Sequence, residues 1–107
     1  MKKLAIIALI GLGLGASSLS ADAAKGKRIY QKFMKEACGK TGGDVSNMHT
    51  QKEWKELEES GKFKDELEKI CPADKDFLEG AKFKKLEKHL FDFMYEYGKG
   101  SGNVPSC

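Results

Sequence analysis

The residues most able to do chemistry in this 107-residue chain are three cysteines and two histidines, Cys38, Cys71, Cys107, His49 and His89. No two of them stand at the short spacing of a structural zinc site or in the Cys-x-x-Cys motif of thiol–disulfide catalysts. The acidic clusters alternate with lysines, as on solvated helix faces, and do not indicate paired catalytic carboxylates. We therefore expect no metal site, no catalytic residue and no enzymatic activity.

The cysteines favour a disulfide instead. Three cysteines allow three single pairings, and their spacing alone does not choose among them. Our hypothesis pairs Cys38 with Cys71, because each lies at the end of a predicted helix. Gly39 provides a left-handed stop directly after Cys38, and Pro72 ends the helix that leads to Cys71. Such a bridge closes a loop of about 33 residues and would stabilise the fold by roughly 3–4 kcal/mol. Cys107 would then be free, or would serve as an alternative partner.

The first 23 residues have the pattern of a secretory signal peptide. Lys2 and Lys3 precede an apolar run over 4–14, and small residues lead to an Ala-x-Ala site at 21–23. The run is shorter than the roughly 20 residues that span a bilayer, so an uncleaved anchor is the weaker alternative. We expect cleavage after Ala23, with 18–20 as an alternative site. The mature chain would have no membrane span and would lie in the periplasm, where disulfides form.

The remaining residues, 24–107, predict one small all-α domain of four or five short helices, and no strand-like alternation is present. A core of this size gains much from a covalent staple. The tail from about residue 98 has no periodicity and is predicted to be irregular, and we expect the first and last helices to pack together. The predicted helices span about 25–38, 51–59, 62–70 and 81–97, with a loop over 40–49 and a helical turn after Asp74.

Local signals mark the start of the second helix. Thr50 and Glu53 have the spacing of a capping box, and His49 and Trp54 occupy the two positions of a hydrophobic staple. This pattern gives His49 a structural role beside Trp54, and we expect Trp54 to be buried.

Charge gives no indication of a nucleic-acid partner. The formal net charge is only +3, and the 19 basic and 16 acidic residues are interspersed. A nucleic-acid-binding domain of this size would show a concentrated basic face.

The segment Gly26-Lys27-Arg28-Ile29-Tyr30, followed eight residues after the tyrosine by Cys38, resembles the first helix of class I c-type cytochromes. In that family the helix leads into a Cys-x-x-Cys-His motif and packs across an aromatic-rich last helix. The chain is also similar, at 37–39, 49–51 and 101–107, to small exported bacterial proteins of cytochrome c type. The resemblance implies a cytochrome c-like fold, electron transfer, haem as cofactor and a periplasmic redox protein as partner. Candidate aromatic residues in the last helix are Phe91, Phe93, Tyr95 and Tyr97.

The haem-attachment motif itself is absent. When Cys38 is aligned with the second haem cysteine, Lys35 replaces the first and Gly39 replaces the proximal histidine. In the family the distal methionine ligand lies before the last helix, but no methionine occurs between Met48 and Met94 here. The alternative function is therefore a haem-free, disulfide-stabilised binding module that kept the scaffold and lost the cofactor.

If haem is bound, His49 and His89 are its candidate ligands. The competing roles are a hydrophobic staple for His49 and an exposed helix position for His89. Phe91 and Tyr95 widen the apolar stripe of the last helix, which indicates either burial on two sides or a face for a partner.

Overall fold

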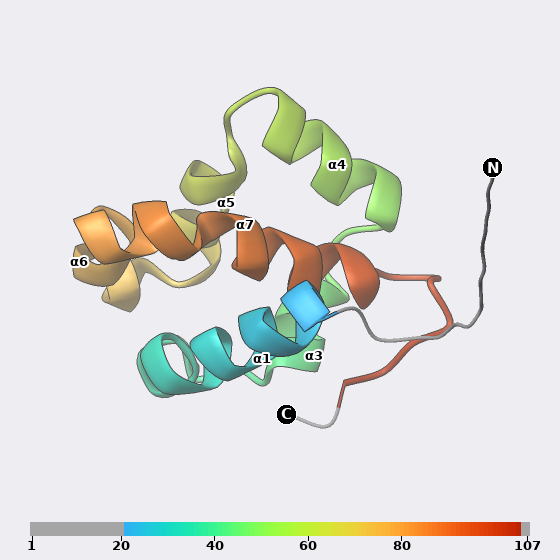
Figure 1. Ribbon diagram of the computed structural model, residues 1–107, viewed down its shortest axis with the longest axis horizontal. Helices are drawn as coiled ribbons and strands as arrows, with labels where there is room; N and C mark the ends of the chain where they lie inside the picture. The colour runs from blue at the N-terminus through green and yellow to red at the C-terminus, as the bar shows by residue number, and fades with distance from the viewer. Residues whose placement is uncertain (1–20, 106–107) are drawn as a thin grey trace, which may run out of the picture.

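The computed structural model describes residues 21–105; residues 1–20 of the predicted signal peptide, and Cys107, lie outside the described residues. Within 21–105 the chain is helical, with no strand and only an isolated bridge between Thr50 and Lys99. The elements, shown in Figure 1, are α1 (Ala21–Phe33), α2 (Lys35–Cys38), α3 (Gly42–Ser46), α4 (Gln51–Glu59), α5 (Phe63–Ile70), the 3-10 helix η3 (Pro72–Asp74), α6 (Lys75–Leu78) and α7 (Ala81–Glu96). The all-α prediction is confirmed. No helix in this part of the chain is long and apolar enough to cross a membrane.

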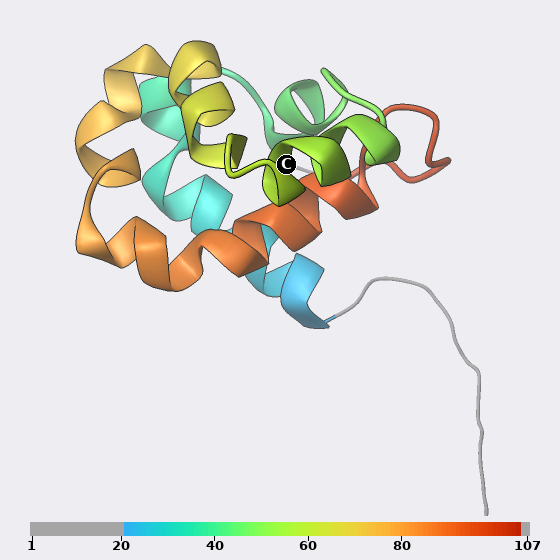
Figure 2. The ribbon, with the colours of Figure 1, turned by 90° about the horizontal axis from the view of Figure 1, so that it is seen from above.

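The contact between α1 and α7 organises the molecule, as expected for the first and last helices (Figures 1 and 2). The helices approach most closely at Gly26, where an added Cβ would overlap the carbonyl oxygen of His89 and lie 2.8 Å from Cβ of Phe93. Only glycine permits this approach of the two backbones. One turn further along α1, the buried Tyr30 ring lies 6.1 Å from the ring of Phe93.

The core is continuous and rich in aromatic side chains. Trp54 of α4 contacts Phe63 of α5 edge to face, with 5.8 Å between the ring centroids, and Phe63 contacts Phe91 of α7 in the same way. Trp54 is 0 % exposed, so its predicted burial is confirmed. The other buried core residues are Ile29, Tyr30, Met34, Val45, Leu67, Cys71, Leu78, Phe83, Leu90, Phe93 and Met94.

The predicted number of helices was too low, because the described residues hold seven α-helices and one 3-10 helix. The predicted loop over 40–49 was also wrong, since it contains α3. A capping box begins this helix: Oγ1 of Thr41 accepts a hydrogen bond from the Asp44 amide, and the Asp44 side chain accepts one from the Thr41 amide. Burial of Val45 stabilises the turn despite the low helix propensity of Gly42 and Gly43.

The predicted first helix is interrupted. The structure ends α1 at Phe33 and begins α2 at Lys35, with Met34 between them at φ −123°. Met34 is fully buried, so the break directs an apolar side chain into the core. The helix after η3 occurs as predicted, but the Asp74 side chain makes no capping hydrogen bond there.

Candidate functional site

A disulfide joins Cys38, the last residue of α2, to Cys71, which follows α5. The two Cα atoms are 4.7 Å apart, and the cysteines are separated by 33 residues in sequence. The predicted pairing therefore matches the structure. The Cys71 side chain is buried and Cys38 is partly exposed, so the bridge anchors the end of α2 onto the core.

His49 lies between α4 and α5. Its Nε2 is 2.8 Å from a carboxylate oxygen of Glu66, and its Nδ1 is 3.4 Å from Glu53. The ring also contacts Trp54 edge to face, with 4.8 Å between centroids, which is the contact expected from the staple pattern. The capping box is present too, because Thr50 accepts a hydrogen bond from the Glu53 amide. This arrangement holds His49 in a structural position.

The Glu53 carboxylate completes that capping box. It accepts a hydrogen bond of 2.9 Å from the Thr50 amide. This hydrogen bond, helped by the neighbouring His49 ring, lowers the pKa of Glu53 below its ordinary value.

His89 lies at a different helix interface, between α7 and the start of α1. Its Nδ1 is buried and lies 3.2 Å from Oδ1 of Asp22, although the alignment is not that of a hydrogen bond. Asp92 completes a group whose ligand atoms all lie within 4.8 Å of one another. The Lys88 ammonium occupies the same space, 3.3 Å from Asp92 and 3.6 Å from Asp22, so this group already has a cation. Hydrogen bonding to Asp92 raises the pKa of Lys88.

The predicted domain boundary after Ala23 falls inside α1. Ala23 is fully buried, and the Asp22 carboxylate lies 3.2 Å from Nδ1 of His89 and 3.6 Å from Nζ of Lys88. Cleavage at that position would remove these contacts from the mature chain.

The two histidines do not fit a shared haem iron. Axial ligation needs both rings to face one metal, whereas His49 lies against α4 and α5 and His89 against α1. Each ring is also surrounded by carboxylates, which would repel the anionic propionates of a haem. The hollow beside His49, of about 380 Å³, is open and lined by Glu53 and Glu56 together with Leu57 and Ser60. The core between the helices is filled by protein side chains.

Asp74 is the unusual buried residue near the disulfide. It is 7 % exposed, its amide donates to the Cys71 carbonyl oxygen over 3.0 Å, and its Oδ2 has no hydrogen-bond partner. Loss of hydration raises the pKa of Asp74 from its ordinary value of 3.8 to about 6. The sequence does not distinguish this residue from an exposed capping aspartate, because its burial depends on how η3 packs against α2.

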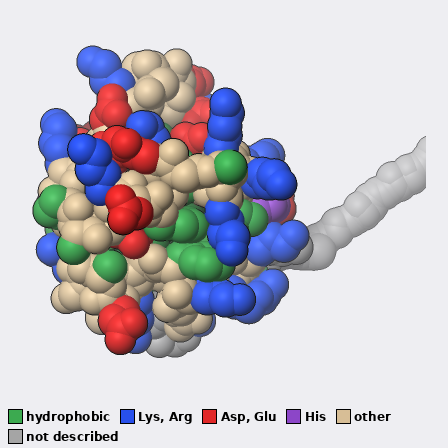
Figure 3. Space-filling model, turned by 90° about the vertical axis from the view of Figure 1, so that its left-hand side faces the viewer, with side chains coloured by type: hydrophobic (Ala, Val, Ile, Leu, Met, Phe, Trp, Pro, Cys, Tyr) green, Lys and Arg blue, Asp and Glu red, His purple; other side chains and the backbone are tan. Residues whose placement is uncertain are grey.

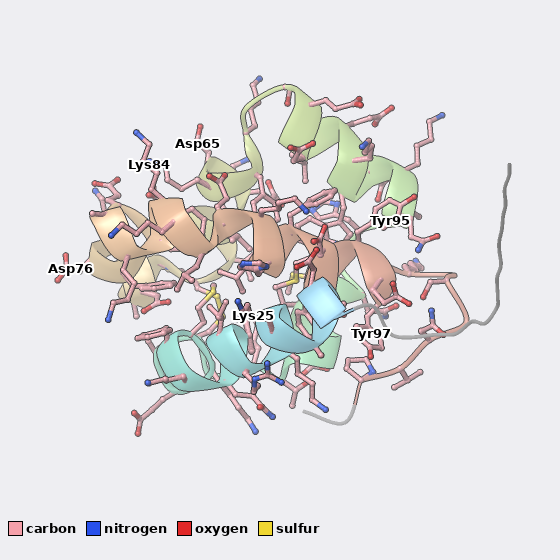
Figure 4. The ribbon with its side chains drawn as sticks, viewed as in Figure 1. Lys25, Asp65, Asp76, Lys84, Tyr95 and Tyr97 are labelled. Atoms are coloured by element: carbon pink, nitrogen blue, oxygen red, sulfur yellow. A yellow bond between two sulfur atoms is a disulfide. The ribbon has the colours of Figure 1, made fainter. Side chains whose placement is uncertain are left out.

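Phe91 and Tyr95, which widen the apolar stripe of α7, differ in burial. Phe91 packs against Phe63. Tyr95 is 39 % exposed, and its ring contacts that of Phe91 with 5.7 Å between the centroids. Tyr95 and Tyr97 lie on opposite sides of the end of α7 (Figure 4). Tyr97 helps to line a polar hollow of about 340 Å³ between α3 and the tail, which Thr41, Asn103 and Pro105 also line. Neither His49 nor His89 lines this hollow.

Comparison with family models, curated proteins and solved structures adds no relative, because none of the three gives a match to this chain.

Proposed function

We propose that this chain is an exported, non-enzymatic, haem-free binding module held together by the Cys38–Cys71 disulfide. The observation that carries the proposal is the state of Cys38. This residue aligns with the second haem cysteine of the cytochrome pattern, but its sulfur is bonded to Cys71 and is not available for a thioether. The place of the proximal histidine is taken by Gly39, at φ +69°, where a side chain would be strained.

The packing of the interior supports the same conclusion. Trp54, Phe63 and Phe93 are all essentially inaccessible to solvent; Trp54 contacts Phe63, and Phe93 contacts Tyr30 of α1. A domain of this size needs such side chains for its own core, and the disulfide supplies further stability. A small rigid domain without a cofactor acts through its surface, which is the basis for proposing a binding role.

A cytochrome c-like electron carrier is the second candidate, and one observation favours it. Gly26 and Tyr30 of α1 pack on Phe93 of α7 in the way that the resemblance to class I c-type cytochromes implies. This contact supports a shared scaffold. It does not supply a haem ligand, since His49 and His89 are held apart by their own partners.

An absorption spectrum separates the two candidates. The chain would be expressed with its leader in a host competent for cytochrome maturation, purified, and measured before and after addition of dithionite. The haem-free proposal expects only the absorption of Trp54 and the tyrosines. A Soret band that sharpens on reduction would contradict it, and loss of that band in His49→Ala or His89→Ala variants would identify the ligand.

A further inference from the structure

Six basic side chains form one exposed face along α1, α2 and α7. Lys25, Arg28 and Lys32 follow one another on α1 at spacings of three and four residues, which places them on one side of that helix, and Lys35 begins α2 directly after the break at Met34. Lys82 and Lys85 lie one turn apart at the start of α7 and are also exposed. We call these six residues the basic face.

The two rows of the basic face lie side by side. The ammonium groups of Lys32 and Lys82 both lie over the ring of Phe33, at 5.4 Å and 4.9 Å from its centroid. At the other end of the contact, Asp22 of α1 pairs with Lys88 of α7, and Lys85 stands one turn before Lys88. The rows therefore run next to each other along the α1–α7 contact. Figure 4 shows Lys25 on α1 beside α7, whereas Lys84 points to the other side of α7.

The basic face lacks internal neutralisation. Among the described residues, none of its six side chains has an acidic partner within 4 Å. The lysines of α4 and α5 are in a different situation, because three of them form ion pairs within their own helices. These pairs are Lys55 with Glu59, Lys64 with Glu68, and Lys69 with Glu66.

This segregation of charge is hidden in the linear sequence, where basic and acidic residues alternate. α4 and α5 carry seven of the sixteen acidic residues, namely Glu53, Glu56, Glu58, Glu59, Asp65, Glu66 and Glu68. Figure 1 shows α4 and α1 on opposite sides of α7. Like charges three or four residues apart on a helix repel each other and destabilise it. An acidic partner would relieve this repulsion along the whole basic face.

The basic face also contains an aromatic contact point. Phe33 and Phe77 are partly buried and stack with 5.0 Å between centroids and 6° between ring planes. Figure 3 shows basic side chains gathered next to hydrophobic surface at this end of the molecule. Aromatic and arginine side chains are frequent at the energetic centre of protein interfaces, and the stacked phenylalanines give the basic face apolar surface of this kind.

We propose that the basic face binds a carboxylate-rich surface of a partner protein, an inference that rests on the proposed binding function. Charge complementarity selects an acidic partner and would accelerate its association. A lipid surface fits less well, because Phe33 lies under the Lys32 and Lys82 ammonium groups and stacks on Phe77, and neither ring is an exposed hydrophobic side chain that could enter the acyl region.

Two variants with equal loss of charge test this proposal. The first replaces Arg28, Lys32, Lys82 and Lys85 of the basic face with glutamine. The matched control replaces four basic residues around α4 and α5 with glutamine, Lys55, Lys62, Lys64 and Lys69. The probe is poly-L-glutamate, titrated against isotope-labelled full-length domain by NMR at two salt concentrations. Vesicles of phosphatidylglycerol serve as the lipid probe.

The proposal expects shifts confined to α1, α2 and the first half of α7, weakened by added salt. The basic-face variant should lose about tenfold or more in affinity for poly-L-glutamate, while the control keeps the wild-type affinity. Equal loss in both variants would mean that binding follows net charge alone and would overturn the proposal, as would binding to vesicles without binding to poly-L-glutamate. A haem spectrum would overturn the haem-free function but would leave this comparison unaffected.

Discussion

Nε1 of Trp54 donates a hydrogen bond of 2.9 Å to the carbonyl oxygen of Ser46. Both residues are fully buried, so this bond joins α4 to the end of α3 inside the core. The bond also helps to explain why α3 is an ordered helix. The carbonyl oxygen of its last residue accepts a hydrogen bond from a buried donor, and its first turn is stabilised by the capping box of Thr41.

Trp54→Phe removes the donor and leaves the Ser46 carbonyl oxygen buried without its partner. We expect a loss of about 1–3 kcal/mol in the free energy of unfolding, measured by urea denaturation. Tyr95→Phe is the control, because that ring is exposed and should change stability by less than about 0.5 kcal/mol. Wild-type fluorescence at the wavelength of a hydrated indole would contradict the burial on which this prediction depends.

Cys38→Ser/Cys71→Ser opens the covalent loop. The double variant should lose roughly 3–4 kcal/mol of stability, since the unfolded chain regains the entropy of a 33-residue loop. Addition of dithiothreitol to the wild type should produce the same shift in the urea midpoint. Cys107→Ser should leave the midpoint of the monomer unchanged. Detection of free thiols at both Cys38 and Cys71 in unreduced peptides would show that the bridge does not form.

Gly26→Ala places a methyl group against the backbone of α7. The overlap with the His89 carbonyl oxygen should force α1 and α7 apart and cost about 1–3 kcal/mol, even though alanine is the better helix former. Gly43→Ala in α3 is the matched control, because its new methyl group would lie no closer than 3.4 Å to any neighbour, at Pro105 Cγ, with Pro105 Cδ at 3.6 Å and Thr41 Oγ1 at 3.8 Å. That variant should be neutral or up to about 1 kcal/mol more stable. Equal effects of the two substitutions in thermal unfolding would contradict the close approach of the helices.

Asp74 should make stability depend on pH in an identifiable way. Its pKa of about 6 in the folded protein exceeds the ordinary 3.8, so the folded state binds the proton more tightly than the unfolded chain. The resulting stabilisation is complete below about pH 4 and is lost as pH rises through 6, and the difference corresponds to roughly 3 kcal/mol.

Asp74→Asn tests this dependence, because the amide keeps the shape of the carboxyl group without its charge. We expect the variant to be more stable than the wild type near neutral pH by up to roughly 3 kcal/mol, and the advantage to vanish by about pH 4. Asp76→Asn, at an exposed position of the next helix, should show no such trend in urea denaturation at several pH values. A difference between Asp74→Asn and wild type that stays constant with pH would show that folding does not raise the pKa of Asp74.

The parts of the fold that sequence predicts well are those with local causes. The capping box of Thr50 begins α4, and apolar residues spaced by three and four define α7 to within one residue of its end. The close packing of first and last helices also follows, since each has one apolar stripe to bury. The staple contact of His49 with Trp54 belongs to this class, because both residues lie next to the cap.

Features that depend on residues distant in the chain could not be predicted from the sequence. The partner of His49 on α5, Glu66, is 17 residues away, and burial of Val45 overrides the two glycines of α3. The break at Met34 depends on space in the core, and the basic face depends on α1 and α7 lying together. Each of these is a tertiary effect that local propensity does not contain.

Two different contacts hold distant parts of the chain together, the noncovalent packing of α1 on α7 and the covalent Cys38–Cys71 disulfide, and they would respond differently to tension. A pull applied at residues 22 and 105 would load the α1–α7 contact, which has no covalent link across it. The disulfide carries the force directly from Cys38 to Cys71. The helices between these residues, α3, α4 and α5, would therefore carry little force and would add no length to the extended chain while the bridge is intact. Under tension only the segments outside the disulfide-closed loop would extend, namely residues 22–37 and 72–105.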